Sequence, residues 1–148
     1  MKIQDFSHHL KGLKEELQRQ LSRDLPKKVG NIAVRMFKKN FQKESFFGRA
    51  WQEVKRRLQG AKGAAGNRKI LTGPTGNLGR SIQFVPHDGF VTIESDLPYS
   101  EAHNEGTTNA GRSHNVRIPQ RQFIGESPEL TAAIEKKIED EIYKALNK

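Results

Sequence analysis

The sequence predicts an α+β fold in a single domain, with helices at both ends of the chain and a small antiparallel β-sheet between them. Three observations carry this prediction. Apolar residues recur at helical spacing near each end, the middle alternates in the manner of strands, and turns rich in glycine and proline separate the two patterns. The length of 148 residues fits one domain of about 100–150 residues.

The N-terminal segment has the clearest helical pattern. Its apolar residues alternate in steps of three and four, with polar residues on the other side; they are Ile3, Phe6, Leu10, Leu13 and Leu17, with Leu21 and Leu25 continuing the face. The stripe is too short for a free coiled coil, so we expect it to dock on its own domain or on a neighbouring subunit. Binding to a membrane surface is disfavoured because the polar face mixes both signs of charge.

A second helix is expected directly after the first. Asp24-Leu25-Pro26 should end the first helix, and Pro26 suits the first turn of the next. The next apolar face comprises Val29, Ile32, Ala33, Met36, Phe37 and Phe41. Residues 1–58 are therefore expected to be mainly helical, beginning with a helical hairpin. Trp51 fits a core or interface anchor better than a platform for stacking bases, because no second aromatic residue matches it.

Residues 59–69 are predicted to form a mobile basic loop, because glycine and cationic residues dominate the segment. Its glycines do not have the spacing of a Walker phosphate-binding loop. A second polar segment, residues 107–115, is also expected to be a mobile loop. The residues of these loops that are candidates for facing DNA are Lys62, Arg68, Lys69 and Arg112.

Residues 70–126 are expected to hold the sheet and most of the turns. The segments 81–85 and 90–94 alternate like strands, and His87-Asp88-Gly89 between them is a hairpin signal. Residues 98–105 are predicted to form one or two helical turns, and 116–118 a short strand.

The last helix is predicted over residues 127–148. Ser127 is suited to cap its N-terminus, and Pro128 to occupy its first position. We expect this helix to pack on the sheet, which needs at least one helical cover.

Charge is unevenly distributed along the chain. The net charge is +9, but residues 1–70 hold 18 Lys and Arg against 6 Asp and Glu, whereas residues 71–148 hold 8 against 11. Such a division can serve nucleic-acid binding, or it can let the two halves of neighbouring copies attract each other. Both explanations stay open at this point.

The apolar content is low for a self-sufficient core. The apolar residues make up 34% of the chain, and glycine raises this to roughly 43%, where globular domains have about 45–50%. Some apolar burial is therefore expected to need a partner subunit. The sequence has no cysteine, no signal-peptide pattern and no apolar run of about 20 residues, so we expect a soluble cytoplasmic protein without membrane contact.

No combination of residues indicates a reaction. The five histidines lack the spacing of a zinc site, and no nucleophile occurs in a recognised catalytic setting. His103-Asn104 and His114-Asn115 suggest a nuclease of the His-Asn-His type, but the ββα frame and the ligand set are missing. We therefore expect no cofactor, no metal and no enzymatic activity.

Three short motifs follow one another in the second half of the chain. They are a Thr-Gly-x-Leu-x-x-Ser-Ile turn, a Tyr-x-x-x-His-x-x-Gly turn and an Ile-Pro-x-Arg-x-Phe-x-Gly-x-Ser turn. Their residues are Gly76, Leu78 and Ser81 in the first, Tyr99, His103 and Gly106 in the second, and Pro119, Arg121, Phe123 and Gly125 in the third.

Several of these residues have physical interpretations of their own. Tyr99 and His103 are four apart and should share a helix face, where His103 would brace the turn as a structural histidine with its hydrogen bonds satisfied. Arg121 suits an ion pair with an acidic residue of its own chain or of a neighbour. Phe123 should be a buried anchor.

In this order and with these gaps, the motifs resemble the phage virion-morphogenesis or tail-completion family, which includes neck and tail-terminator proteins. The resemblance covers roughly residues 25–147. It implies a structural protein of the head–tail neck or tail end that acts as a homo-oligomeric ring, such as a hexamer, around the DNA channel. The implied partners are further copies of the chain, the tail tube and head–neck proteins, with non-specific contact to DNA.

The resemblance also implies a location: the host cytoplasm during assembly, and then the virion. The alternative from the residues themselves is a small basic nucleic-acid-binding protein, motivated by the charge of residues 1–70. Against it, no helix-turn-helix or RNA-binding signature is present.

Overall fold

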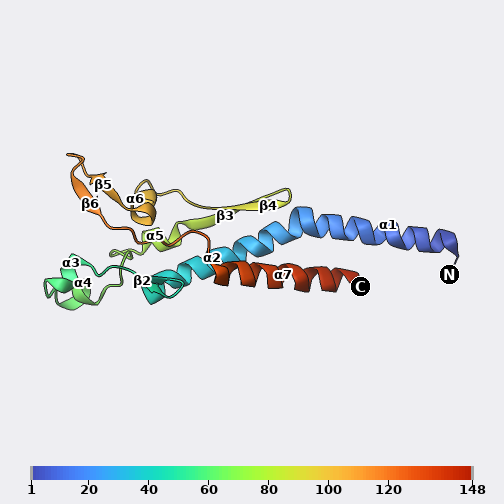
Figure 1. Ribbon diagram of the computed structural model, residues 1–148, viewed down its shortest axis with the longest axis horizontal. Coiled ribbons are helices and arrows are strands. Elements are labelled where there is room, and N and C mark those ends of the chain that lie inside the picture. Colours follow the sequence, from blue (N-terminus) through green and yellow to red (C-terminus); the bar gives the residue numbers. More distant parts are fainter. Residues whose placement is uncertain (1, 148) are drawn as a thin grey trace.

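A long bent helix runs along most of the molecule and organises the rest of the fold (Figure 1). The computed structural model describes residues 2–147. The long helix comprises α1 (Ile3–Arg19), a π-helical turn η1 (Gln20–Asp24) and α2 (Leu25–Lys43). The predicted α+β class, with helices at both ends and antiparallel strands between them, is confirmed.

The predicted N-terminal helical hairpin is wrong, because the chain does not turn back at Pro26. The backbone N–H of Leu25 donates to the carbonyl of Gln20, which makes the local turn π-helical. Pro26 has no N–H to donate to the preceding turn. The carbonyl of Ser22 instead accepts from the N–H of Gly89, 3.2 Å away. The proline therefore bends the helix at a point where another part of the chain bonds to it.

Helix α2 ends at Glu44, which adopts a left-handed conformation with φ 52°. A small antiparallel hairpin follows, made of β1 (Ser45–Phe46) and β2 (Arg49–Ala50). The chain then forms two short helices, α3 (Lys55–Leu58) and α4 (Gly63–Asn67). The predicted basic loop over 59–69 is therefore wrong in part, since a helical turn occupies its middle.

The hairpin predicted around His87-Asp88-Gly89 is confirmed. The short helix α5 (Asn77–Arg80) leads into β3 (Ile82–His87), which pairs with β4 (Phe90–Ser95) in antiparallel register. This hairpin lies on α2. A Cβ atom at Gly30 of α2 would lie 2.5 Å from the ring of Phe84, so the approach of the two elements requires glycine there.

The helical turn predicted before Gly106 is confirmed as α6 (Ser100–Glu105). The predicted mobile loop over 107–115 is wrong in part. Its first residues form β5 (Thr107–Ala110), which pairs with β6 (Val116–Ile118) across a turn. Across residues 2–147, the strands make three separate two-stranded sheets in place of the single small sheet that was expected.

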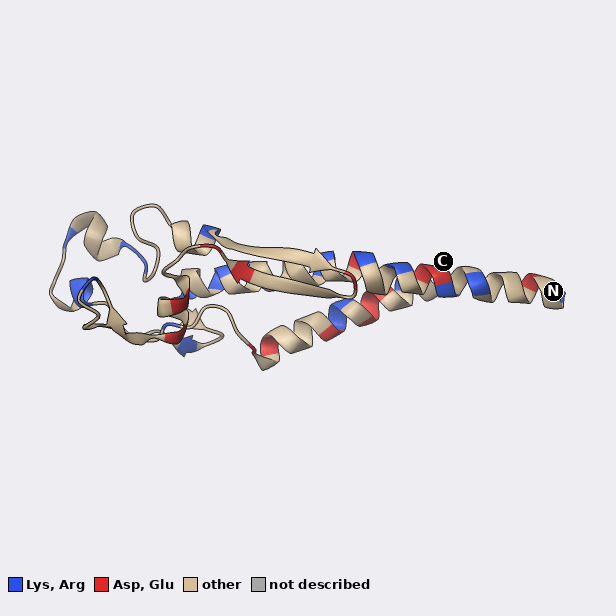
Figure 2. Cartoon of the chain, turned by 90° about the horizontal axis from the view of Figure 1, so that it is seen from above, with Lys and Arg blue, Asp and Glu red and all other residues tan. Residues whose placement is uncertain are grey.

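The C-terminal helix α7 (Pro128–Leu146) begins as predicted. The Ser127 hydroxyl accepts from the N–H groups of Glu129 and Leu130, at 3.2 and 3.3 Å. However, α7 runs antiparallel along α2 and contacts α1 (Figures 1 and 2). The β3–β4 hairpin lies on α2 as well, and the two views place it apart from α7. The prediction that the last helix packs on the sheet is therefore wrong.

The core lies between α2, the β3–β4 hairpin and the segment before α7. The ring of Phe41 contacts the rings of Trp51 and Phe123 at centroid distances of 5.4 and 5.3 Å. The Trp51 indole N–H donates to the carbonyl of Gln122 at 2.8 Å. Trp51 and Phe123 are thus the buried anchors that the sequence predicted. Helix α1 contributes no buried residue to this core.

Candidate functional site

The first motif builds the turn that leads into β3. Gly76 has φ 67° at the N-terminus of α5, a left-handed conformation that suits glycine. Leu78 is buried in the core. The Ser81 hydroxyl donates to the carbonyl of Leu78 and lies 2.6 Å from the Ser95 hydroxyl of β4. These residues connect the turn to the core and to the hairpin.

The second motif forms α6, and the third motif lies against it. The rings of Tyr99 and His103 meet edge to face with centroids 6.1 Å apart, as their spacing predicted. Gly106 ends α6 with φ 76°, and a Cβ atom there would lie 2.9 Å from the backbone nitrogen of Gln120. Only glycine therefore fits where the chain of the third motif passes.

Arg121 in the third motif is buried, with 8% of its surface exposed. Its Nε donates to the carbonyl of Gln52 at 2.8 Å, and Nη2 donates to the carbonyl of Glu53 at 3.2 Å. The ion pair expected within the chain is thus replaced by hydrogen bonds to the backbone. At Gly125, a Cβ atom would lie 2.0 Å from Nε2 of Gln122, so a larger residue there would require the Gln122 side chain to move.

Asn104 is the residue that the sequence analysis missed. Its Oδ1 accepts from the N–H groups of Phe123 and Ile124, both at 2.9 Å, and its carbonyl accepts from Nε2 of Gln120. The second motif therefore holds the third in place. In the sequence, Asn104 belongs only to a weak nuclease-like pattern with His103, and no local signal indicates its long-range hydrogen bonds.

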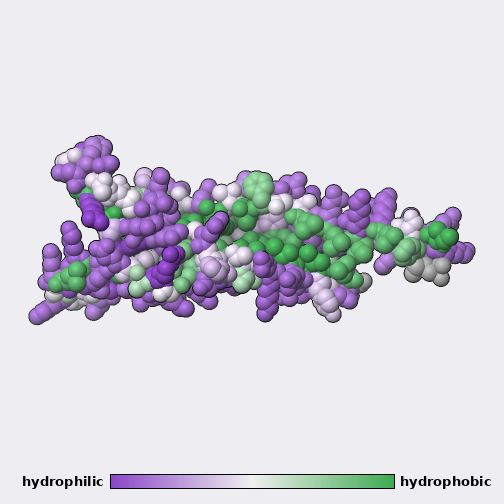
Figure 3. All heavy atoms as spheres, in the orientation of Figure 1, coloured by the Kyte–Doolittle hydropathy of each residue, from purple (hydrophilic) through white to green (hydrophobic). Residues whose placement is uncertain are grey.

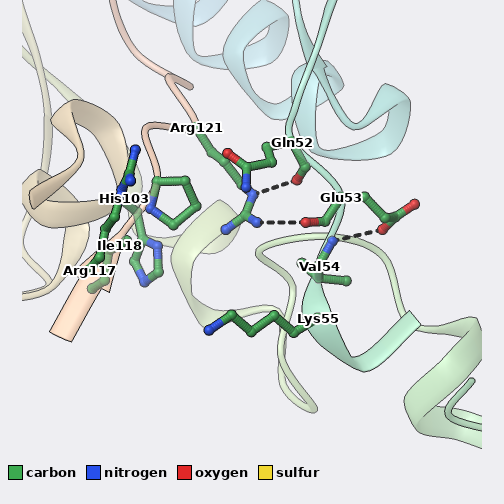
Figure 4. Close-up of a pocket in the computed structure, with 9 residues that line it drawn as sticks. Gln52, Glu53, Val54, Lys55, His103, Arg117, Ile118 and Arg121 are labelled. Atoms are coloured by element: carbon green, nitrogen blue, oxygen red, sulfur yellow. Dashed lines mark hydrogen bonds between the residues drawn. The ribbon is translucent and has the colours of Figure 1, made fainter. Parts of the chain in front are cut away.

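The motifs meet at two adjacent cavities of about 440 and 370 Å³, which share Val54, His103 and Arg121. The larger also has Pro119 in its wall, and the smaller has Leu78 and Tyr99. Figure 4 shows the larger cavity.

His103 differs from the satisfied structural histidine that was expected. Its Nδ1 is buried without a hydrogen-bond partner among residues 2–147. Burial, and secondarily the charge of Arg121, lower the pKa of the imidazole. The neutral imidazole is therefore favoured, and its Nδ1 is an unpaired polar atom at the place where the motifs converge.

The candidate DNA-facing residues gather at one end of the molecule. Lys62 and Lys69 are exposed near α4, Arg68 is half-buried, and Arg112 is exposed in the turn between β5 and β6. Figure 1 places these two segments at the end opposite the N-terminus.

Two further arginines of this end have structural roles. Arg57 forms a bidentate pair with Glu44 at 2.7 and 2.8 Å, and this hydrogen bonding lowers the pKa of the Glu44 carboxyl. Nε of Arg56 donates to the carbonyl of Ala65, and Nη2 to those of Arg68 and Lys69. They fix the conformation of the α3–α4 segment.

The opposite end of the molecule carries an exposed apolar surface, which we call the α1 stripe. It comprises the apolar residues on one face of α1 and η1: Ile3, Phe6, Leu10, Leu13, Leu17 and Leu21. Ile3 is 88% exposed, Phe6 52% and Leu10 48%. The middle of the stripe forms a shallow groove of about 390 Å³. Figure 3 shows apolar surface continuing from the middle of the molecule along α1.

Within residues 2–147, no cluster of three or more His, Cys, Asp or Glu side chains has the arrangement to hold a metal ion. Among the same residues, none of the helices combines the length and apolar character needed to cross a membrane.

Comparison with known proteins places the chain in a family. The family model described as "phage virion morphogenesis family" matches residues 1–146, nearly the full length, including all three motifs and α1. No curated protein and no solved structure shows a significant match. The description of the matching family concerns the building of the virus particle, which agrees with a site rich in shape-holding contacts. This chain belongs to the phage virion morphogenesis family.

Proposed function

We propose that the chain is a structural protein of the head–tail junction or tail end, where it completes the tail by assembling into a ring around the DNA channel. The observation that carries this proposal is the α1 stripe. A row of exposed and half-buried apolar side chains, formed by Ile3, Phe6 and the leucines of the stripe, is typical of a surface that is buried in an assembly. The family match supports a role in building the particle.

The α1 stripe is unlike a membrane-binding face. The polar side of α1 carries Asp5, Glu15 and Glu16 as well as Lys11, Lys14 and Arg19. Anionic lipids favour helices with a cationic polar side, whereas mixed charges suit contact with protein. Each 100 Å² of the stripe removed from water contributes about 2.5 kcal/mol to association before the entropic costs.

A ring follows if each copy offers two different surfaces to its neighbours. Head-to-tail contacts between unlike surfaces close into rings when a whole number of equal rotations between copies adds up to a full turn. The charge of the chain favours this arrangement, because residues 1–70 are strongly basic and residues 71–148 are slightly acidic. We propose a cyclic homo-oligomer such as a hexamer, docked on the tail tube and on head–neck proteins.

The test substitutes one residue of the α1 stripe. Leu10→Glu places a charge in the stripe, and because Leu10 is not part of the core, the fold should persist. We expect the wild type to form rings with a central hole in electron micrographs, alone or on purified tail tubes, and Leu10→Glu to lose them. Light scattering gives the mass of each species.

The matched control is Gln4→Glu, which makes the same change in charge on the polar side of the same helix. It should assemble like the wild type. A wild-type protein that stays monomeric on tail tubes, or a Leu10→Glu protein that still forms rings, contradicts the proposal.

The second candidate function is nucleic-acid binding, favoured by the basic residues at the α4 end of the molecule. In the ring these residues would touch DNA without reading its sequence. A free DNA-binding protein would instead bind duplex DNA with submicromolar affinity at moderate salt, with a steep salt dependence. A titration of duplex DNA at several salt concentrations separates the two.

A further inference from the structure

The larger cavity at the meeting point of the motifs is lined by an excess of cationic groups. Lys55, Arg117 and Arg121 line it together with His103 (Figure 4). Its one acidic lining residue is Glu53, whose Oε1 accepts from the N–H of Val54 at 2.9 Å and lies 3.4 Å from Nη1 of Arg57. In Figure 4, the Glu53 carboxylate points away from Arg121. This one carboxylate acts on Arg121 through its charge, but it does not balance the three cationic groups of the lining.

Arg121 has an unused donor in this cavity. Its Nε and Nη2 are bonded to the carbonyls of Gln52 and Glu53. Nη1 is not among the buried unpaired atoms of residues 2–147, so it is open to an incoming acceptor. A guanidinium always carries its charge in proteins, and the cost of burying that charge is only partly offset by the charge of Glu53. The guanidinium fork is already oriented by its two backbone bonds, so an incoming acceptor would not have to immobilise it.

His103 adds a second unused polar atom on the same cavity. Its Nδ1 is buried and has no partner in the described part of the chain. A neutral imidazole carries one N–H donor, and that donor serves an oxygen ligand when the proton is on Nδ1. A cationic lining, an accessible guanidinium donor and one unpaired imidazole nitrogen favour an oxyanion as the ligand.

We propose that this cavity binds the carboxylate of an acidic side chain presented by a neighbouring protein subunit. A carboxylate on a flexible side chain can reach a guanidinium that is only 8% exposed. Duplex phosphates, by contrast, are attached to a stiff and broad rod. The 11 acidic residues within 71–148 make a second copy of the chain one source of such a side chain. The proposal does not depend on ring formation, because the isolated chain should bind a free carboxylate.

The test uses the full chain with sodium acetate as the probe, at constant ionic strength maintained with sodium chloride. We expect acetate to shift the ring resonances of His103 saturably in NMR spectra and to raise the measured pKa of its imidazole, since a nearby anion favours the charged form. Arg121 is left unchanged because it also holds the backbone of Gln52 and Glu53.

The informative variant is Lys55→Gln with Arg117→Gln, which removes two cationic groups from the cavity rim. Both residues are exposed, so the fold should persist. Acetate affinity should fall about fivefold or more. The matched control is Lys62→Gln with Arg112→Gln, which removes one lysine and one arginine that do not line the cavity. It should bind acetate like the wild type.

Three results would overturn the proposal. One is the absence of a saturable effect of acetate on His103. Another is an equal loss of affinity in the control variant, which would indicate only the diffuse charge of the surface. The third is a shift of the His103 resonances by a short DNA duplex that acetate cannot reverse, which would make the cavity a nucleic-acid contact. Failure of ring assembly would leave the acetate result unchanged, so the two proposals are tested separately.

Discussion

Asn104 shows how a single amide organises the meeting of two motifs. Its Oδ1 accepts hydrogen bonds from the backbone N–H groups of Phe123 and Ile124. Without Asn104, these two N–H groups would have no acceptor where the chain passes α6. An unpaired buried N–H costs roughly 1–3 kcal/mol. The segment that carries Arg121 and Phe123 is therefore held by one side chain as well as by the core.

Asn104→Ala is expected to lower the free energy of unfolding by about 2 kcal/mol or more, because two N–H groups lose their acceptor. Asn104→Asp is the matched control, since its carboxylate keeps an acceptor oxygen in the same place. Chemical denaturation of both variants measures the difference. Equal stability of the Ala and Asp variants would contradict the role assigned to Oδ1.

At the scale of elements, helices α2 and α7 are joined by a cluster of charges. The Glu141 carboxylate, 4% exposed, pairs with Lys28 of α2 and with Lys137 at 2.9 Å, while Lys144 lies 3.6 Å away. Hydrogen bonds from Lys28 and then Lys137 lower the pKa of Glu141 to about 2, from an ordinary value of 4.5. The ionised form is therefore favoured in the folded protein.

The sign of the pH dependence follows from this depressed pKa. Glu141 contributes stability that is fully present above about pH 4.5, and this contribution is lost as the pH falls towards about 2. Glu141→Gln should lower the stability at pH 7 by about 1–2 kcal/mol and flatten the acid limb of the stability curve. Thermal unfolding of both proteins between pH 2 and 7 measures the difference in stability and its pH dependence.

The control for this experiment is Glu139→Gln on the same helix. Glu139 is exposed, and the structure records no ion pair for it within residues 2–147. Its substitution should leave the pH profile nearly unchanged. A profile that changes equally in both variants would mean that net charge, and not the α2–α7 cluster, governs acid sensitivity.

The elements that the sequence predicted correctly are those with local signals. Asp88-Gly89 gives a turn between alternating segments, and Ser127-Pro128 marks the start of α7. The break predicted at Pro26 was wrong. The Ser22 carbonyl, which has no N–H to accept from at Pro26, accepts from the N–H of Gly89, more than 60 residues away. Residues 107–110 were missed as a strand because their polar sequence does not alternate.

The individual residues of the candidate site could be predicted from the sequence, but their convergence in space could not. Gly76 and Gly106 could be identified as turn residues, because the positive φ angles of such turns favour glycine over other residues. The convergence of His103 and Arg121 could not be predicted, because it depends on the backbone carbonyls of Gln52 and Glu53. Carbonyl groups are common to every residue and give no sequence signal.

At the scale of the whole molecule, the chain is elongated because residues 3–43 form one helical rod. At 1.5 Å per residue, this rod is roughly 60 Å long. A compact domain of this length has a radius of gyration of about 15 Å, which corresponds to a diameter of only about 40 Å. The N-terminal part of α1 thus projects beyond the rest of the molecule, whereas α7 contacts α1 closer to the bend.

Small-angle X-ray scattering of the Leu10→Glu variant tests this shape without interference from assembly. We expect a maximum dimension of at least about 60 Å, set by the rod. A helical hairpin would fold α1 back onto α2 and give a compact particle. A maximum dimension near 40 Å would therefore contradict the continuous helix.

The bond between the Ser22 carbonyl and the Gly89 N–H links the direction of α1 to a hairpin far along the chain. Pro26 makes this possible, because the helix cannot use that carbonyl for itself. The angle between α1 and the rest of the molecule is thus set by a tertiary contact. Any partner that binds the turn of the β3–β4 hairpin would therefore also influence the direction of α1.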